Sequence, residues 1–118
     1  MDLRNEIRKS DQGTPTWGDG SKTDWRKAAE ISGNRILKIA PHWLIIVGGI
    51  DYQLDLTGVK ENPVRLDVPD KLVYSGHFYG FSWGPGLMWS VMSEEWFREK
   101  LFNEQLYLRA LGVPFLLG

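Results

Sequence analysis

The chain of 118 residues contains no cysteine. This absence excludes a disulfide framework and a metal site built on thiolates. A strong charge of either sign is also missing, because the formal net charge is -1 and no long run carries one sign. Nucleic-acid-binding proteins instead carry a basic surface. The sequence therefore predicts no nucleic-acid partner. It also predicts no bound metal, since no His/Asp/Glu group has a convincing ligand spacing.

Long hydrophobic runs are scarce as well. The longest are residues 43–47 and 113–117, far short of the ~20 residues that a membrane helix needs. The sequence therefore predicts no membrane partner. The first residues are charged and show no signal peptide, an observation that leaves the compartment open.

Tryptophan, by contrast, is plentiful, with six in the chain. Core packing is the ordinary explanation for such residues. Trp17, Trp83 and Trp89 fall in loops rich in Gly and Pro, however, where exposed indole rings could stack on flat apolar ligands such as sugar rings. For Trp83 and Trp89, sugar stacking and packing within a loop are both open. The other three tryptophans are expected in the core or against helices.

Two helices are predicted from their caps and from their apolar spacing. Thr23 is expected to cap the first, which Pro41 ends, and Ser93 to cap the second, which ends at Gly112. Gly33 is expected to weaken the first helix by ~1 kcal/mol relative to Ala. The apolar residues at helical spacing are Trp25, Ala28, Ala29, Ile36 and Ile39 in the first helix, and Phe97, Leu101, Leu108 and Leu111 in the second.

Short apolar runs bounded by Gly and Pro predict buried strands at residues 44–47, 72–75 and 114–117, with residues 2–5 as the tail of a further strand. Strands alternating with helices indicate an α/β fold with a parallel sheet. Two helices cannot cover both faces of four parallel strands. The chain is therefore predicted to be part of a (β/α)8 TIM barrel, with residues 1–118 forming a single partial domain. Its exposed sheet edges predict self-association of the isolated chain.

Candidate functional residues follow two of these strands. In a (β/α)8 barrel, functional groups gather at the carboxyl ends of the strands. Asn5 and Glu6 follow the first predicted strand, whereas His77 and Tyr79 follow the third, on one side of an extended segment. A carboxylate, a histidine and a tyrosine are thus expected at one barrel mouth. From the residues alone, Glu6 could equally be a surface carboxylate and His77 a structural histidine.

Four segments in this order resemble glycoside hydrolase family 5, the cellulase-like (β/α)8 barrels, from the fourth strand to the seventh. They are residues 2–6, 43–49, 72–81 and 112–118. The resemblance implies a glycoside hydrolase that cleaves O-glycosidic bonds of β-glucan or related β-glycosides. It further implies a carbohydrate substrate, no cofactor, and an extracellular location for the parent family.

The same resemblance implies roles for individual residues. Glu6 matches the general acid/base of the family, and Asn5 matches the residue that binds the sugar 2-hydroxyl. His77 and Tyr79 match the pair that lines the cleavage subsite. Arg8, together with its near neighbour at position 4, could brace the site.

The catalytic partner of Glu6 is expected just outside the sequence. Retaining glycosidases need two carboxylates roughly 5–5.5 Å apart, and in this family the nucleophile is commonly the Glu of Gly-Glu-Phe-Gly. Gly118 matches the first Gly of that motif. Two departures are Ile7, where Pro is frequent, and Gly48, where many members have Glu; the latter bears on substrate range. The alternative function is a catalytically inactive barrel fragment that at most binds carbohydrate or self-associates.

Overall fold

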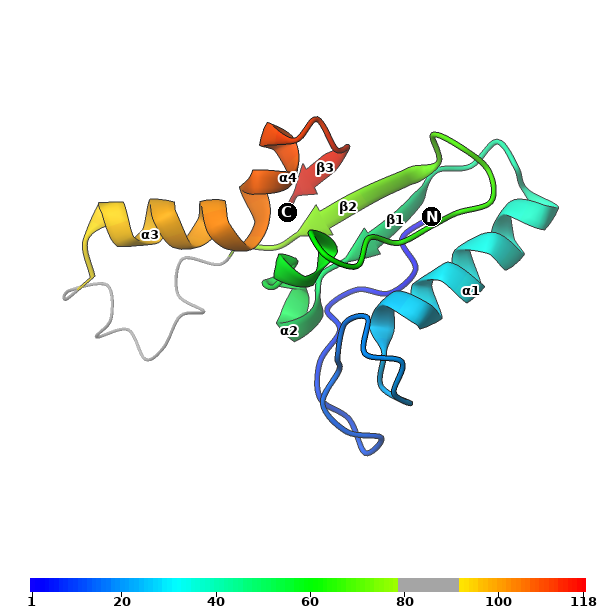
Figure 1. Ribbon diagram of the computed structural model, residues 1–118, viewed down its shortest axis with the longest axis horizontal. Coiled ribbons are helices and arrows are strands. Elements are labelled where there is room, and N and C mark those ends of the chain that lie inside the picture. The colour runs from blue at the N-terminus through cyan, green and yellow to red at the C-terminus, as the bar shows by residue number, and fades with distance from the viewer. Residues whose placement is uncertain (79–91) are drawn as a thin grey trace.

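The computed structural model describes residues 1–78 and 92–118 (Figure 1). Its centre is a parallel sheet in the order β1-β2-β3. The strands are β1 (Ile45–Gly48), β2 (Leu72–Gly76) and β3 (Phe115–Leu117). Each lies within one residue of its predicted position, and their parallel arrangement confirms the predicted α/β class.

Helical segments join the strands. In chain order they are α1 (Trp25–Ile39), α2 (Ile50–Gln53), η1 (Thr57–Val59), α3 (Glu94–Leu101), the π-helical η3 (Phe102–Leu106) and α4 (Tyr107–Ala110). In Figure 1, α1 runs beside the β1–β2 part of the sheet, and α3 extends away beyond the end of β2. The described chain is elongated, with principal dimensions of 49 × 35 × 23 Å.

The predicted first strand is reduced to a single bridge. Asp2 pairs with Ile46 in parallel, supported by a hydrogen bond of 3.1 Å from Leu3 N to Ile46 O. The segment therefore takes the place next to β1 that the prediction gave it, but it does not form a strand among the described residues.

The cap of α1 differs from the prediction. Asp24, not Thr23, caps the helix, since its carboxylate accepts a hydrogen bond from Lys27 N. The same carboxylate accepts from Gly18 N and Gly20 N, both at 2.9 Å. Burial alone would raise the pKa of Asp24, but these backbone donors together lower it below its ordinary value. The prediction that Thr23 caps the helix was wrong. The preceding loop presents several backbone N–H donors, and the two oxygens of the Asp24 carboxylate accept hydrogen bonds from them together.

The buried face of α1 also differs from the predicted one. It consists of Ala29, Gly33 and Leu37, whereas Ile39 is 89% exposed. A Cβ at Gly33 would lie 2.9 Å from Leu66 Cδ2 and 3.2 Å from Ile45 Cγ2. Gly33 therefore allows α1 to approach β1 closely, which offsets the intrinsic cost of glycine in a helix.

The second predicted helix is interrupted. Ser93 caps α3 as predicted, accepting from Trp96 N at 3.1 Å, and Gly112 follows the end of α4 with φ 73°. Between α3 and α4, the π-helical segment η3 has more residues per turn than an α-helix. Residues after η3 therefore lie on a different face from the one that α-helical spacing predicts. As a result Leu108 is buried, whereas Leu111, predicted on the same face, is 65% exposed.

The core lies between the sheet, helix α1 and the segments that follow β1 and β2. Its largest fully buried apolar side chains are those of Tyr74, Ile45, Leu56, Leu108 and Val47. The Tyr74 hydroxyl lies within this core and accepts a hydrogen bond of 2.8 Å from Val64 N. Burial is the main reason that the pKa of Tyr74 rises to about 12, and burial also raises the pKa of Tyr107.

These two tyrosines predict a loss of stability at alkaline pH. An unfolded tyrosine ionises near pH ~10, so the folded state favours the neutral hydroxyl. The stability that this contributes is fully present below pH ~10 and is lost as pH rises towards about 12 for Tyr74. Tyr74→Phe should flatten this alkaline decline and leave the part due to Tyr107.

The measurement is the free energy of unfolding against pH. At neutral pH, Tyr74→Phe should cost about 1–3 kcal/mol, because Val64 N–H loses its buried acceptor. An alkaline decline equally steep in the wild type and in Tyr74→Phe would contradict the prediction.

Candidate active site

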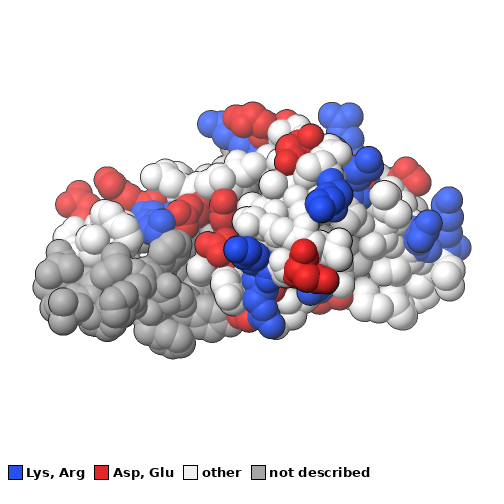
Figure 2. Space-filling model, turned by 90° about the horizontal axis from the view of Figure 1, so that it is seen from below, with Lys and Arg blue, Asp and Glu red and all other residues white. Residues whose placement is uncertain are grey.

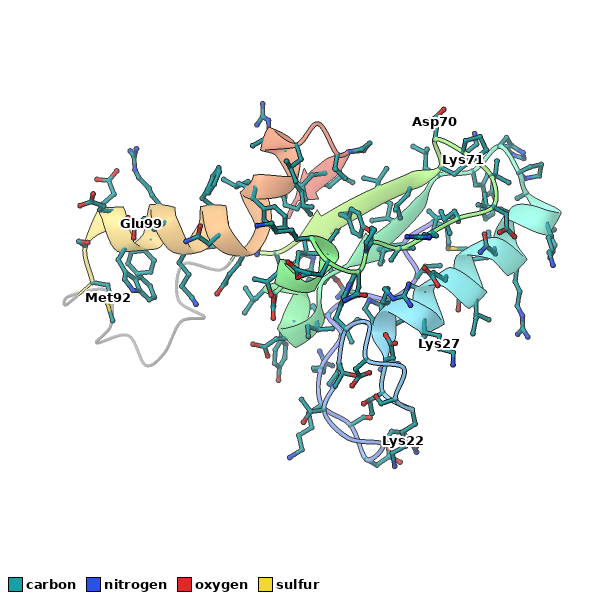
Figure 3. The ribbon with its side chains drawn as sticks, in the orientation of Figure 1. Lys22, Lys27, Asp70, Lys71, Met92 and Glu99 are labelled. Atoms are coloured by element: carbon teal, nitrogen blue, oxygen red, sulfur yellow. The ribbon has the colours of Figure 1, made fainter. Side chains whose placement is uncertain are left out.

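The carboxyl ends of the three strands lie together at one end of the sheet, which is called the carboxyl edge from here on. Their arrowheads point the same way in Figure 1. Asp70 and Lys71, labelled in Figure 3, mark the opposite end of β2. Segments following the strands are therefore brought together, although they are far apart in sequence.

Glu6 lies at this edge in an unusual backbone conformation. Its φ is 51°, in the left-handed region. Its N–H donates a hydrogen bond of 2.6 Å to Gln53 Oε1. Its carboxylate is 21% exposed and lies 3.4 Å from Arg8 Nη1. A partly buried carboxylate that solvent can still reach is suited to proton transfer.

His77 lies beside Glu6, directly after β2. Its Nδ1 is 3.4 Å from Glu6 Oε1 across 71 residues of sequence, and its side chain is 15% exposed. Its backbone is held on both sides, because His77 N donates to Gln53 O at 3.0 Å and His77 O accepts from Gln105 Nε2 at 2.8 Å. The structure thus brings together two of the residues singled out from the sequence.

Gln53 connects these two residues. Its side chain is completely buried. Gln53 Oε1 accepts from Glu6, Gln53 Nε2 donates to Ser75 Oγ at 3.3 Å, and its backbone carbonyl accepts from His77. One residue therefore contacts the segment carrying Glu6, the strand β2 and the residue that follows it.

The segment α2, which carries Gln53, is a strained turn and not a regular helix. Asp51, Tyr52 and Gln53 have φ of 51°, 58° and 65°, all in the left-handed region, and none is glycine. Left-handed backbone costs roughly 1–2 kcal/mol per residue. Hydrogen bonds hold the turn, among them Tyr52 N to Ile7 O at 2.8 Å. The strain is thus maintained by contacts with the segment that carries Glu6.

The π-helical segment η3 supports the same edge from the other side. Gln105 is buried, and its Nε2 donates to Leu54 O at 2.9 Å as well as to His77 O. Gly76 leaves room for this amide, because a Cβ there would lie 2.6 Å from Gln105 Cδ. Single π-helical turns occur frequently at functional sites.

Gly118 also lies at this edge. Gly118 N donates to Gly76 O at 2.9 Å, and Phe78 N donates to Gly118 O at 3.0 Å. A Cβ on Gly118 would lie 3.2 Å from His77 Cδ2. The carboxyl end of β3 therefore lies beside the residues that follow β2, among them the histidine that faces Glu6.

The other predicted site residues have different positions. Asn5 is exposed next to Glu6. Arg8 approaches the Glu6 carboxylate as expected, whereas Arg4 is exposed and its backbone N donates to Asp2 Oδ1. Three further candidates lie outside the described residues: Tyr79, Trp83 and Trp89.

Trp17 is not an exposed platform. It packs against the hydrophobic core, and its Nε1 donates to Asn62 O at 2.8 Å. A Cβ at Gly58 would lie 2.6 Å from its ring. Conversely Trp43, expected to be packed, is 43% exposed. A position in a predicted loop therefore does not by itself indicate whether a tryptophan side chain is exposed or buried.

The second Asn-Glu pair of the chain lies elsewhere. Glu104 belongs to η3, and its carboxylate pairs with Lys100 Nζ at 2.6 Å. Burial raises the pKa of Glu104, and the Lys100 cation opposes this effect. Only the first Asn-Glu pair is in contact with His77 among the described residues.

The described part of the chain has no cluster of metal ligands, and the face in Figure 2 has no large patch of one charge. On the face shown in Figure 2, acidic and basic side chains are interspersed. Over residues 1–78 and 92–118, no three His, Asp or Glu side chains are grouped as a metal site would need. Over the same ranges, no helix combines the length and apolar character required to cross a membrane.

Sequence reasoning missed Gln53 and Gln105. Both are polar residues in segments with no motif, and each acts through contacts more than 20 residues away in sequence. Gly48 and Gly76 are the available signal, because each lacks the side chain that would overlap with one of these amides. Neither glycine indicates by itself which side chain takes the space.

Comparisons with known proteins show similarity to one enzyme family. The sequence model of the family described as Cellulase (glycosyl hydrolase family 5) matches residues 1–118. An endoglucanase of Paenibacillus polymyxa is 42% identical over 117 residues, covering 89% of this chain and 26% of that protein. The major extracellular endoglucanase of Xanthomonas campestris is 49% identical over 93 residues, covering 68% of this chain and 18% of its own length.

Solved structures show the same similarity. A hyperthermostable endocellulase superposes with a TM-score of 0.84 at 31% identity, covering 99% of this chain and 38% of that one. The endocellulase of Pyrococcus horikoshii, in the complex E201A-cellotetraose, gives a TM-score of 0.77 at 32% identity over 92% of this chain and 34% of that one. The chain thus spans about a quarter or less of the length of the Paenibacillus and Xanthomonas endoglucanases.

Proposed function

Because the chain belongs to glycosyl hydrolase family 5, the cellulase family, and its fold is part of a (β/α)8 barrel, we propose that it carries half of the catalytic site of a β-glucan hydrolase. The observation behind this proposal is the contact between Glu6 and His77, 3.4 Å apart. It joins a carboxylate and a histidine at the carboxyl ends of parallel strands, where barrel enzymes have their active sites.

In the proposed reaction, Glu6 is the acid and then the base. It donates its proton to the glycosidic oxygen as a second carboxylate attacks the anomeric carbon, so that the C–O bond breaks and a glycosyl ester forms. Glu6 then takes a proton from water, whose oxygen attacks the anomeric carbon and releases the second carboxylate. This double displacement retains the configuration at the anomeric carbon.

The second carboxylate is proposed to come from the residue after Gly118. The position of Gly118 supports this, because its backbone is hydrogen-bonded to Gly76 and Phe78 and a Cβ there would approach the His77 ring. A side chain one residue further would begin at the same edge as Glu6. A retaining glycosidase needs such a pair, with its two carboxylates roughly 5–5.5 Å apart.

The remaining roles concern the carbohydrate substrate. Asn5 would bind the sugar 2-hydroxyl, and His77 would bind sugar or orient a carboxylate. Tyr79 would contact the nucleophile, and Trp83 and Trp89 would stack on sugar rings. None of these roles requires a cofactor. An extracellular site of action is proposed by analogy with the Xanthomonas relative, whose name describes an extracellular enzyme.

The test is product analysis with the whole protein that carries this chain. Cello-oligosaccharides should be cleaved, and proton NMR of the first products should show the β-anomer before mutarotation. An α-anomer as first product would contradict the retaining mechanism. Failure to cleave any β-glucan would contradict the proposed function itself.

The isolated chain should self-associate, the alternative behaviour proposed for it. Leu116 and Leu117 of β3 are each 51% exposed, and β3 pairs only with β2 among the described strands. An open apolar edge is a template for pairing with another chain. Light scattering after size exclusion should give a mass above the 13.5 kDa of one chain. A monodisperse monomer would contradict this.

A further inference from the structure

We propose that Gln53 is a positioning residue for Glu6. Its buried amide holds the Glu6 backbone in the conformation that directs the carboxylate towards His77. The inference rests on the proposed function, since its consequence is a change in acid catalysis. It concerns a residue that does not touch the reacting atoms.

The geometry of the contact supports this role. The hydrogen bond from Glu6 N to Gln53 Oε1 is 2.6 Å, short for an amide donor. The acceptor is fixed in turn, because Gln53 Nε2 donates to Ser75 Oγ and the side chain has no exposed surface. A buried amide with both ends engaged has little freedom to rotate.

The backbone of Glu6 needs such support. A glutamate with φ 51° is in a region that residues other than glycine occupy at a cost. Loss of the Gln53 acceptor would remove the hydrogen bond that ties the Glu6 N–H to this turn. Relaxation to negative φ would turn the Cα–Cβ bond and move the carboxylate away from His77. The hydrogen bond thus determines side-chain direction through the backbone.

Gln53 also couples Glu6 to His77. The Gln53 carbonyl accepts the His77 N–H at 3.0 Å, while its side chain holds Glu6. The two groups that face each other are thus attached to opposite ends of one residue. Displacement of Gln53 would separate them even if each kept its own rotamer.

Gly48 makes room for this amide. A Cβ at Gly48 would lie 2.6 Å from Gln53 Cδ and 2.7 Å from Nε2. Such distances are too short for carbon–carbon and carbon–nitrogen contacts, so the amide would have to move. Gly48→Ala is therefore a second way to displace Gln53 without removing it.

The experiment compares Gln53→Met and Gly48→Ala with wild type in the whole protein. Methionine keeps the length of the side chain but removes the acceptor. For β-glucan, whose leaving group needs acid assistance, kcat should fall about 10–100-fold with KM nearly unchanged. For an aryl β-glycoside with an activated leaving group, formation of the glycosyl ester needs little acid assistance, so the rate of the burst of released aglycone should fall less than about 3-fold.

Tyr74→Phe is the matched control. It removes the buried hydrogen bond between Val64 N and the Tyr74 hydroxyl and lowers stability, and this bond does not involve Glu6. Its effect on kcat should not depend on the leaving group. Equal losses in kcat on β-glucan and in the burst rate on the aryl substrate for Gln53→Met and Gly48→Ala, or losses confined to KM, would overturn the proposal.

Hydrogen exchange tests the contact without a variant. The Glu6 amide of the wild-type protein should exchange much more slowly than in an unstructured peptide. Exchange at the peptide rate would overturn the proposal even if the variants do not fold. Hydrolysis of neither substrate by the wild type would instead count against the proposed function, and the Glu6 amide would still report on the contact.

Discussion

Glu6→Gln in the whole protein is expected to lower kcat for β-glucan by about 10²–10⁴-fold, the usual contribution of a general acid. Glutamine has nearly the same shape and can keep the contact with His77, but it has no proton to give to the leaving oxygen. The comparison substrate is an aryl β-glycoside with an activated leaving group. Its bond cleavage needs little acid assistance, so formation of the glycosyl ester should remain fast and be visible as a burst.

The chain offers a matched control for this substitution. Glu104→Gln changes the glutamate of the other Asn-Glu pair, which lies in η3 and pairs with Lys100. Its kcat should stay within a factor of about 3 of the wild type, since acid catalysis is not affected. Unchanged turnover of β-glucan by Glu6→Gln, or equal losses for both variants, would remove Glu6 from its proposed role.

Gly49→Ala is expected to destabilise the protein by about 3 kcal/mol or more, because the new methyl group overlaps with backbone. A Cβ at Gly49 would lie 2.9 Å from the carbonyl carbon of Asp55 and closer still to its oxygen. That carbonyl accepts from Ile50 N at 2.9 Å and closes the turn that carries Gln53. It cannot move aside as a flexible side chain would.

Conformational strain does not explain this cost, since Gly49 has φ -65° and ψ 171°. Gly20→Ala provides the contrast. Gly20 has φ 75° with nothing near its Cβ position, so alanine there should cost only about 1 kcal/mol of backbone strain. Denaturant unfolding followed by tryptophan fluorescence measures both. Losses of similar size would contradict the overlap at Gly49.

Much of the fold could be predicted from local patterns. The strands were predictable because short apolar runs are bounded by Gly and Pro. Ser93 was predictable as a cap because two glutamates follow it. The prediction of Thr23 as the cap was wrong, because Thr and Asp are both residue types that commonly cap a helix and the sequence does not decide between Thr23 and Asp24. The choice depended on Gly18 and Gly20, whose N–H groups approach only after the loop folds back.

The site, like the fold, contains residues that could be predicted from the sequence and residues that could not. The meeting of Glu6 and His77 could be predicted because carboxyl ends of parallel strands share an edge. Gln53 could not, because no motif marks it. Its turn is left-handed without a glycine, against the local preference of those residues. Gly48 could be noticed as a departure from the family pattern. In the structure, Gly48 leaves room for the Gln53 amide, and no local pattern in the sequence predicts that contact.

The separation of the site contacts along the chain has a consequence for the order of folding. Glu6 and His77 are 71 residues apart, and Glu6 and Gln53 are 47 apart. Each contact closes a long loop, whose entropy must be lost before the contact contributes. The hydrogen bonds within helix α1 join residues close in sequence, so forming them closes no long loop. We therefore expect newly made chains to gain helical structure first and the site last. Mutations that slow pairing of β1 with β2 would then delay the appearance of activity more than that of secondary structure.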